Sequence, residues 1–208
     1  MSADPELLAL WTRGWALTRG VSAPVWDEGG WRIEVGAPDQ LRRFVFAEAD
    51  GRVSERAALV REPNVFLKVC AEASDVQPLL PTGWLIRTPG FLMTLEGQMP
   101  RGRAPDGIET VFETVGGVLF CRLALDGAEA ARGRAVVVDG VTIFDRIAVD
   151  EAWRRRGLGR EVMRRLQVET GSDRRGVLVA TRDGRALYET LGWRLHSAYT
   201  TAASPGSL

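Results

Sequence analysis

The chain has 208 residues, of which 45% are hydrophobic and 26% charged, a composition typical of a folded protein with one large domain or slightly more. No apolar run approaches the roughly 18 residues that a membrane helix needs, so we expect no membrane span. The two cysteines, Cys70 and Cys121, stand in apolar stretches, which favours a reducing cytoplasm over a disulfide framework. A single histidine, His196, argues against a histidine-rich metal site or triad, and we expect no metal.

The net charge of zero conceals an uneven distribution. The chain has 27 basic and 27 acidic residues, and its only lysine is Lys68. From Glu151 onward 11 arginines face 6 acids, a net charge of +5, which leaves −5 for the first 150 residues. Such an asymmetry between segments indicates where an anion binds.

The first half of the chain shows short elements of both kinds. Helical spacing of apolar residues predicts a helix over 6–17, followed by a loop over 22–31. We then expect strands in 42–49 and 64–72, a helical turn at 75–80, and two short strands within 84–97. Glycine, proline and charge gather in 97–107, which is the best linker candidate. We therefore expect an N-terminal α/β segment over 1–98, packed on a core formed by 99–208.

The second half has a clearer pattern. Strands are expected over 117–125, 134–138 and 141–149, the last two joined by a tight turn at Asp139-Gly140. A helix over 157–170 follows, then a buried strand over 176–181, a helix from a cap at Asp183 to Gly192, and a last strand over 193–200. This order predicts an α/β protein with a mixed sheet.

The passage from the strand 141–149 into the following helix has the features of an anion site. Gly157 and Gly159 open the helix, whose first N–H groups lack internal partners and carry partial positive charge. Four arginines suited to forked contact with phosphate stand beside them: Arg154, Arg155, Arg156 and Arg160. The alternatives for the arginine run are a solvated basic turn and a contact to nucleic acid.

Two known phosphate motifs do not fit. Val162 occupies the third glycine position of the dinucleotide fingerprint, and no Lys-Ser or Lys-Thr pair is present. The segment Arg154-x-x-Gly157-x-Gly159 instead resembles the acyl-coenzyme A signature of the GNAT N-acetyltransferase superfamily. The run ALYETLGW, residues 186–193, is similar to the late helix of that family. The resemblance implies a GNAT-like mixed, mostly antiparallel central sheet flanked by helices.

The resemblance also implies roles for particular residues. The pyrophosphate of acetyl-CoA would lie on the backbone N–H groups of the loop, and the pantetheine arm would pair with the strand before it. Tyr188 would protonate the departing thiolate. The chain differs from the family pattern at three positions: Thr181 replaces a frequent asparagine, Gly184 a usual alanine and Glu151 a frequent proline. The cofactor residues implied are Ile147, Ala148, Val149, Arg154, Arg155, Arg156, Gly157, Leu158, Gly159 and Arg160.

The general base is not fixed by the resemblance. Asp145 interrupts the apolar face that Val141, Ile143, Ile147 and Val149 would share, and a carboxylate in such surroundings resists ionisation. Asp145 is therefore the candidate base, with pairing to an arginine as its alternative. Two carboxylates remain rivals, Glu109 and Glu113. For Tyr188 the alternative is a plain packing role.

Together these features predict a cytoplasmic acyltransferase that moves an acetyl group from acetyl-CoA to a primary amine by direct attack. Residues 1–98 are expected to form the acceptor side, packed on the core, with a semi-independent α/β half as the alternative. The acceptor is a small molecule or a peptide, and a homodimer remains open. Two other functions are alternatives: a non-catalytic acyl-CoA sensor, and a nucleic-acid-binding module that uses the basic C-terminal segment. The balanced total charge counts against nucleic acid as a partner.

Overall fold

The computed structural model describes residues 2–207. They form two compact units, and neither unit is one continuous stretch of chain. Unit 1 contains the residues up to Leu92, the segment Val179–Arg182, and the residues from Leu195 onward. Unit 2 contains Met93–Leu178 and Asp183–Arg194. The chain thus passes from one unit to the other inside the strands β6 (Gly90–Leu95), β11 (Gly176–Ala180) and β12 (Arg194–Ala203), and at the first residue of the helix α5 (Arg182–Glu189).

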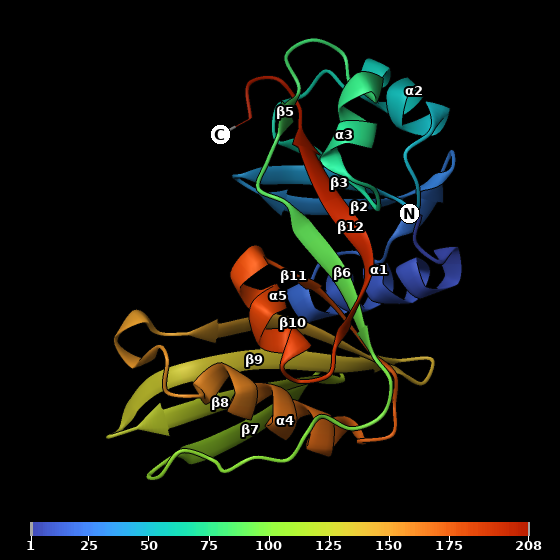
Figure 1. Cartoon of the computed structure of the whole chain (residues 1–208). Coiled ribbons are helices and arrows are strands. Elements are labelled where there is room, and N and C mark those ends of the chain that lie inside the picture. Colours follow the sequence, from blue (N-terminus) through green and yellow to red (C-terminus); the bar gives the residue numbers. More distant parts are fainter. Residues whose placement is uncertain (1, 208) are drawn as a thin grey trace. The chain divides into compact units, whose positions relative to one another are not determined.

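Unit 1 is built on a mixed sheet with the strand order β1-β2-β3-β4-β12 (Figure 1). β3 runs parallel to β4, the other neighbours are antiparallel, and the two-residue β5 pairs with β12. Besides β12, the strands of this unit are β1 (Val25–Asp27), β2 (Gly30–Ala37), β3 (Gln40–Phe46), β4 (Val65–Val69) and β5 (Leu85–Ile86).

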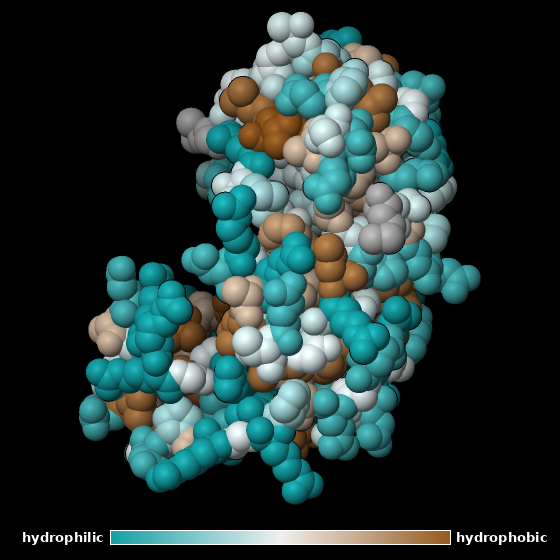
Figure 2. Space-filling model, in the orientation of Figure 1, coloured by the Kyte–Doolittle hydropathy of each residue, from teal (hydrophilic) through white to brown (hydrophobic). Residues whose placement is uncertain are grey.

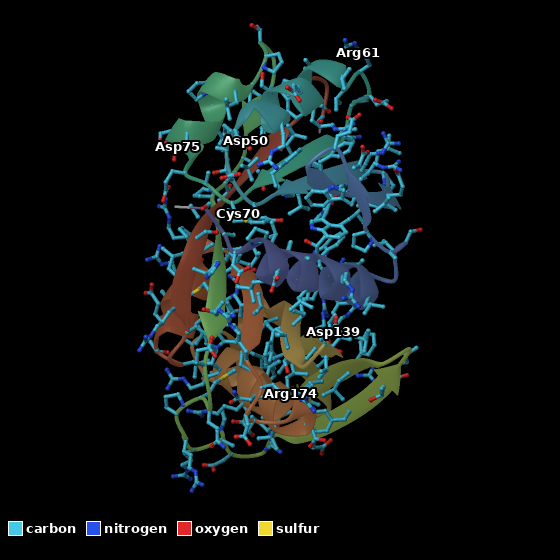
Figure 3. All side chains as sticks on the ribbon, turned by 90° about the vertical axis from the view of Figure 1, so that its right-hand side faces the viewer. Asp50, Arg61, Cys70, Asp75, Asp139 and Arg174 are labelled. Carbon is cyan, nitrogen blue, oxygen red and sulfur yellow. The ribbon has the colours of Figure 1, made fainter. Side chains whose placement is uncertain are left out.

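Helices cover both faces of this sheet. An apolar cluster that includes Phe44, Leu67 and Ala202 joins one face to α2 (Gly51–Leu59) and to the short α3 (Ala73–Val76), which continues into the 3-10 turn η1 (Gln77–Leu79). Asp50 caps α2, because its carboxylate accepts the N–H of Arg52 at 3.0 Å (Figure 3). On the other face lies α1 (Pro5–Arg19), which Asp4 and Gly20 cap at its two ends.

A cationic layer lies between α1 and the sheet. In the register of β3, β4 and β12, Arg43 and Lys68 share one face of the sheet with Thr201. The guanidinium of Arg43 stacks 3.5 Å from the ring centroid of Trp15 on α1, and Lys68 Nζ donates to Thr201 Oγ1 at 2.9 Å. Burial, together with the nearby charges of Arg43 and Arg19, lowers the pKa of Lys68 to about 7.

The lowered pKa of Lys68 predicts a pH-dependent stability. In the unfolded chain the amine keeps its proton up to its ordinary pKa of 10.5, whereas the folded protein releases it from about pH 7 upward. The unfolded state therefore binds more protons between these values, and the free energy of unfolding rises with pH. We expect a rise of about 2 kcal/mol between about pH 7 and about pH 9. Urea denaturation at both pH values measures it.

The Lys68→Met variant should lack this rise and should be more stable than the wild type at neutral pH. Arg61→Met, which removes a positive charge from an exposed position, is the matched control and should keep the rise (Figure 3). A rise that persisted in Lys68→Met would contradict the assignment.

Unit 2 contains a second sheet, with the strand order β11-β10-β9-β8-β7 (Figure 1). All its pairings are antiparallel except the one between β10 and β11. β9 and β10 meet at Asp139-Gly140, where both residues have positive φ, 46° and 83°, as in the tight hairpin turn that this dipeptide predicts (Figure 3). The remaining strands of the unit are β7 (Glu109–Val115), β8 (Val118–Leu125), β9 (Ala128–Val138) and β10 (Val141–Val149).

Three helical segments belong to unit 2: η2 (Glu151–Trp153), α4 (Leu158–Thr170) and α5 (Arg182–Glu189), whose first residue falls in unit 1. α4 packs on the sheet across Gly133 of β9. A Cβ atom there would lie 2.6 Å from Val162 and 3.0 Å from Leu166, so only glycine permits this close approach. Both sheets carry helices, and the predicted mixed, mostly antiparallel GNAT-like architecture is confirmed.

The two units repeat one order of elements. In unit 1 the hairpin β2–β3 leads through α2 into β4, which is parallel to β3. In unit 2 the hairpin β9–β10 leads through α4 into β11, which is parallel to β10. The sequence has no fixed-period repeat that would have predicted this duplication.

Several predicted elements differ from the structure. The expected loop over 22–31 contains β1 and the start of β2, and α2 had no predicted counterpart. Asp183 lies in the first turn of α5 and does not cap it. Within residues 2–207, no helix is long and apolar enough to cross a membrane.

Candidate active site

The site region begins at a bulge in β10. The β9/β10 register shifts between Asp145 and Ala148, and Arg146 has a φ of 53°, which is rare for a residue with a side chain. Ile147 consequently points to the side of Gly133 and α4, because its Cδ1 lies 2.5 Å from the position a Cβ would take at Gly133. Asp145 pairs with the next residue, Arg134, and so faces the other side. The expectation that Asp145 and Ile147 share one face was therefore wrong.

Beyond the bulge, one edge of β10 is open. β10 and β11 pair only at Thr142–Gly176 and Ile143–Val177 among the described residues. Ala148 and Val149 pair with β9 on their other side. The backbone of 147–149 therefore faces β11 without a strand partner, which is the condition for adding an extended ligand to a sheet edge.

The segment after β10 leads through η2 and a turn into the start of α4. Asp150 accepts the N–H of Ala152 and caps η2, and the chain then turns through two residues with positive φ, Arg155 at 64° and Gly157 at 81°. Gly157 is the N-cap of α4 and makes no side-chain capping bond. The first N–H groups of the helix, those of Leu158, Gly159 and Arg160, accordingly point out of its end.

Gly159 has a packing role. A Cβ atom at this position would lie 3.1 Å from Leu187 of α5 and 3.5 Å from Val149 of β10. The absence of a side chain lets the end of β10, the start of α4 and α5 meet closely.

The loop arginines lie mostly in solvent. Arg154, Arg155 and Arg156 are exposed, and Arg160 is partly buried. The guanidinium of Arg156 stacks 4.9 Å from the ring centroid of Trp153, while Arg160 Nη2 donates to Thr190 Oγ1 at 3.2 Å. Arg154 lies 3.8 Å from the Glu151 carboxylate, a weak exposed contact. The exposed guanidinium groups beside the helix end favour an anion there.

Tyr188 reaches the same region from α5. It is only 7% exposed, and its ring lies 6.0 Å from that of Trp193. Burial raises the pKa of Tyr188 well above its usual range, and the negative charge of Asp145 raises it further. Tyr188 and Asp145 are therefore close enough to interact electrostatically, and the phenol keeps its proton throughout the physiological pH range.

The other candidates lie elsewhere. Glu109 and Glu113 are exposed on the edge strand β7, which β8 and β9 separate from β10. His196 belongs to unit 1, where its Nε2 accepts the N–H of Asp4 at 3.0 Å. Burial raises the pKa of the Cys70 thiol to about 12 and that of Cys121 to about 11, so neither is a thiolate near neutral pH.

The sequence did not predict that the linker 97–107 lies beside the loop. The expected linker 97–107 passes beside the loop, because Pro105 Cγ lies 3.9 Å from the position a Cβ would take at Gly157. A cavity of about 300 Å³ separates the linker from the start of α4. The arginines of 101–103 are a charge signal that could have suggested this proximity.

Comparisons with known proteins agree with the resemblance. A family model described as an acetyltransferase (GNAT) domain matches residues 111–195. No curated protein matches the chain by sequence. Among solved structures, a GCN5-related N-acetyltransferase from Kribbella flavida is similar over 98% of this chain and 96% of its own, with a TM-score of 0.69 and 15% identity.

Two more solved structures show the same fold. A GCN5-related N-acetyltransferase-like protein from Streptococcus suis has a TM-score of 0.63 and 13% identity, with 96% of this chain and 94% of its own covered. A tandem GNAT protein from the clavulanic acid biosynthesis pathway has a TM-score of 0.56 and 12% identity, with 85% and 78% covered.

The chain therefore has the fold of these solved GNAT structures. Residues 111–195, which span the core of unit 2, match the model of the GNAT acetyltransferase domain, and the solved structures have the same fold, in agreement with the prediction of a GNAT-type N-acetyltransferase. The domain indicates acetyl transfer as its general activity.

Proposed function

We propose that the protein transfers an acetyl group from acetyl-CoA to a primary amine. The observation that carries this proposal is the open edge of β10 leading directly into the uncapped N-terminus of α4. This arrangement offers an extended edge for a pantetheine chain and a set of N–H groups for a pyrophosphate, in the order in which coenzyme A presents these parts.

The binding residues follow from that arrangement. The backbone of Ile147, Ala148 and Val149 pairs with the pantetheine arm. The N–H groups of the loop and of the first helical turn hold the pyrophosphate, and the arginines neutralise its charge. The loop residues are Arg154, Arg155, Arg156, Gly157, Leu158, Gly159 and Arg160. The donor set fits the group, because it contains exposed cations and unpaired helical N–H groups. The two carboxylates within 147–160 are Asp150, which caps η2, and the exposed Glu151.

In the proposed reaction Asp145 is the general base and Tyr188 is the general acid. Acetyl-CoA supplies an acetyl group activated as a thioester. As the amine nitrogen bonds to the carbonyl carbon and the carbon–sulfur bond breaks, Asp145 accepts the proton of the amine, directly or through water. Tyr188 donates its phenolic proton to the departing thiolate.

The interaction between these two groups supports a coupled transfer. While Asp145 is ionised, its charge raises the pKa of Tyr188. Once Asp145 has taken the proton of the amine, that contribution disappears and Tyr188 becomes a stronger acid. The acid is thus strengthened at the stage when the thiolate leaves.

The proposal also includes the chemical class of the acceptor and the cellular compartment. A small-molecule or peptide amine is the acceptor, and the segment before Glu151, with its net charge of −5, favours a cationic one. The free, buried cysteines fit a reducing cytoplasm. In the part of the chain that the structure describes, no cluster of three or more His, Cys, Asp or Glu side chains could hold a metal.

The proposal is tested in two steps. Millimolar acetyl-CoA should raise the melting temperature, because a ligand that binds only the folded state stabilises it. An amine panel with detection of free coenzyme A should then identify at least one acceptor. No stabilisation by acetyl-CoA would overturn the proposal, whereas binding without turnover on any amine would favour an acyl-CoA sensor.

A further inference from the structure

The linker 97–107 is fixed along α4. The side chain of Gln167 holds its first part on both sides, since Oε1 accepts the N–H of Met99 and Nε2 donates to the carbonyl of Gly97, each at 2.9 Å. Arg164 Nε donates to the carbonyl of Pro100, also at 2.9 Å. In Figure 1 this segment is the green coil that runs from β6 past α4 to β7. Three hydrogen bonds from one helix thus give the linker a defined path.

The cavity beneath this linker is strongly basic. Its lining contains four arginines and one aspartate: Arg103, Asp106, Arg156, Arg160 and Arg164. Gly102 and Pro105 bring the linker backbone close, because a Cβ at Gly102 would touch the guanidinium of Arg164. The lower edge of the molecule, along which this segment runs in Figure 1, is coloured mostly as hydrophilic in Figure 2.

The charges in this cavity are only partly compensated. Arg103 Nη2 contacts both carboxylate oxygens of Asp106 at 3.0 Å, but both side chains are 84% exposed, so this pair is weak. Arg156 stacks on Trp153, which carries no formal charge. The buried Nε of Arg160 has no hydrogen-bond partner within the described residues. A net positive charge of three therefore surrounds a space large enough for a phosphate group.

We propose that this linker cavity binds the 3′-phosphate of the coenzyme A ribose. The inference rests on the proposed function, which places the pyrophosphate on the adjacent N–H groups of the loop. Arg156, Gly157 and Arg160 belong to both the loop and the cavity lining, so the cavity adjoins the loop that holds the pyrophosphate in the proposed function. In coenzyme A one ribose separates the pyrophosphate from the 3′-phosphate. A phosphate monoester carries close to two negative charges, which forked arginine contacts recognise.

Titration calorimetry with coenzyme A and 3′-dephospho-coenzyme A tests the inference. The two ligands differ only in the phosphate in question. The wild type should bind coenzyme A at least about tenfold more tightly, as expected for the loss of a charge-assisted contact. Arg103→Ala and Arg164→Ala should each reduce this preference several-fold and leave the affinity for the dephospho compound unchanged.

Arg174→Ala is the matched control. Arg174 lies beyond the opposite end of α4, where its Nε donates to the carbonyl of Thr170, and its removal changes the net charge equally (Figure 3). The control should keep the full preference for coenzyme A.

The outcomes separate the two proposals. The cavity assignment alone would be overturned if the wild type bound both ligands with equal affinity. It would also be overturned if Arg103→Ala and Arg164→Ala lost affinity for both ligands equally. Failure of either ligand to bind the wild type would overturn the proposed function, and the cavity assignment with it.

Discussion

Replacement of Tyr188 by phenylalanine is expected to lower the rate of acetyl transfer by about 100-fold or more, the usual contribution of a positioned general acid. Tyr188 is buried beside Trp193, and phenylalanine retains the ring that packs there. The variant should therefore fold normally and should bind acetyl-CoA as the wild type does. Single-turnover kinetics with the acceptor that the amine panel identifies would measure the change in the chemical step.

A packing role for Tyr188 predicts a different result. If the ring alone matters, Tyr188→Phe should keep the full rate, and the assignment as an acid would be wrong.

Asp145→Asn provides the companion measurement. Because asparagine cannot accept the proton of the amine, the rate should fall and the acidic limb of the pH–rate profile, which reports ionisation of the base, should disappear. A profile that kept this limb would exclude Asp145 as the base.

Replacement of Gly157 by valine is expected to abolish the stabilisation by acetyl-CoA. Gly157 has a φ of 81°, and a β-branched residue is strongly disfavoured there. The loop must rearrange at the point where the N–H groups of α4 meet the pyrophosphate, so we expect an affinity loss of more than about 100-fold. A thermal-shift titration with acetyl-CoA would measure it.

Gly140→Val is the matched control for this variant. Gly140 has nearly the same φ, 83°, and a Cβ there would meet nothing within 4 Å, whereas one at Gly157 would make only an ordinary contact with Pro105 at 3.9 Å. Gly140 lies in the β9–β10 turn at the other end of β10. Both variants should lose about 1–2 kcal/mol of stability through backbone strain, and only Gly157→Val should lose binding. Retained binding by Gly157→Val would show that the loop does not hold the coenzyme.

Much of unit 2 could be predicted from sequence because its elements carry strong local signals. The hairpin at Asp139-Gly140 has turn residues that need positive φ, and α4 has a regular apolar stripe behind two glycines. These signals also located the loop. The bulge at Asp145 was not predicted, because a single residue with positive φ leaves the alternation of β10 looking regular in the sequence.

Unit 1 was harder to predict. α2 has only nine residues, and its buried contacts come mainly from Val53 and Ala57, too few for a clear periodic pattern. The pairing of β12 with β4 joins residues about 130 positions apart, which no local signal encodes. The linker contacts with Gln167 and Arg164 are likewise long-range hydrogen bonds of polar side chains, a kind that periodicity does not detect.

The return of the chain to unit 1 has a consequence for synthesis on the ribosome. β4 lies early in the chain, but the strand that covers one of its edges, β12, is the last to be translated. Since nascent chains emerge from the N-terminus at about 5–20 residues per second, β4 must wait several seconds for this partner. During that interval its exposed edge can pair with another chain. Unit 1 therefore reaches its final sheet only after nearly all of unit 2 has been made.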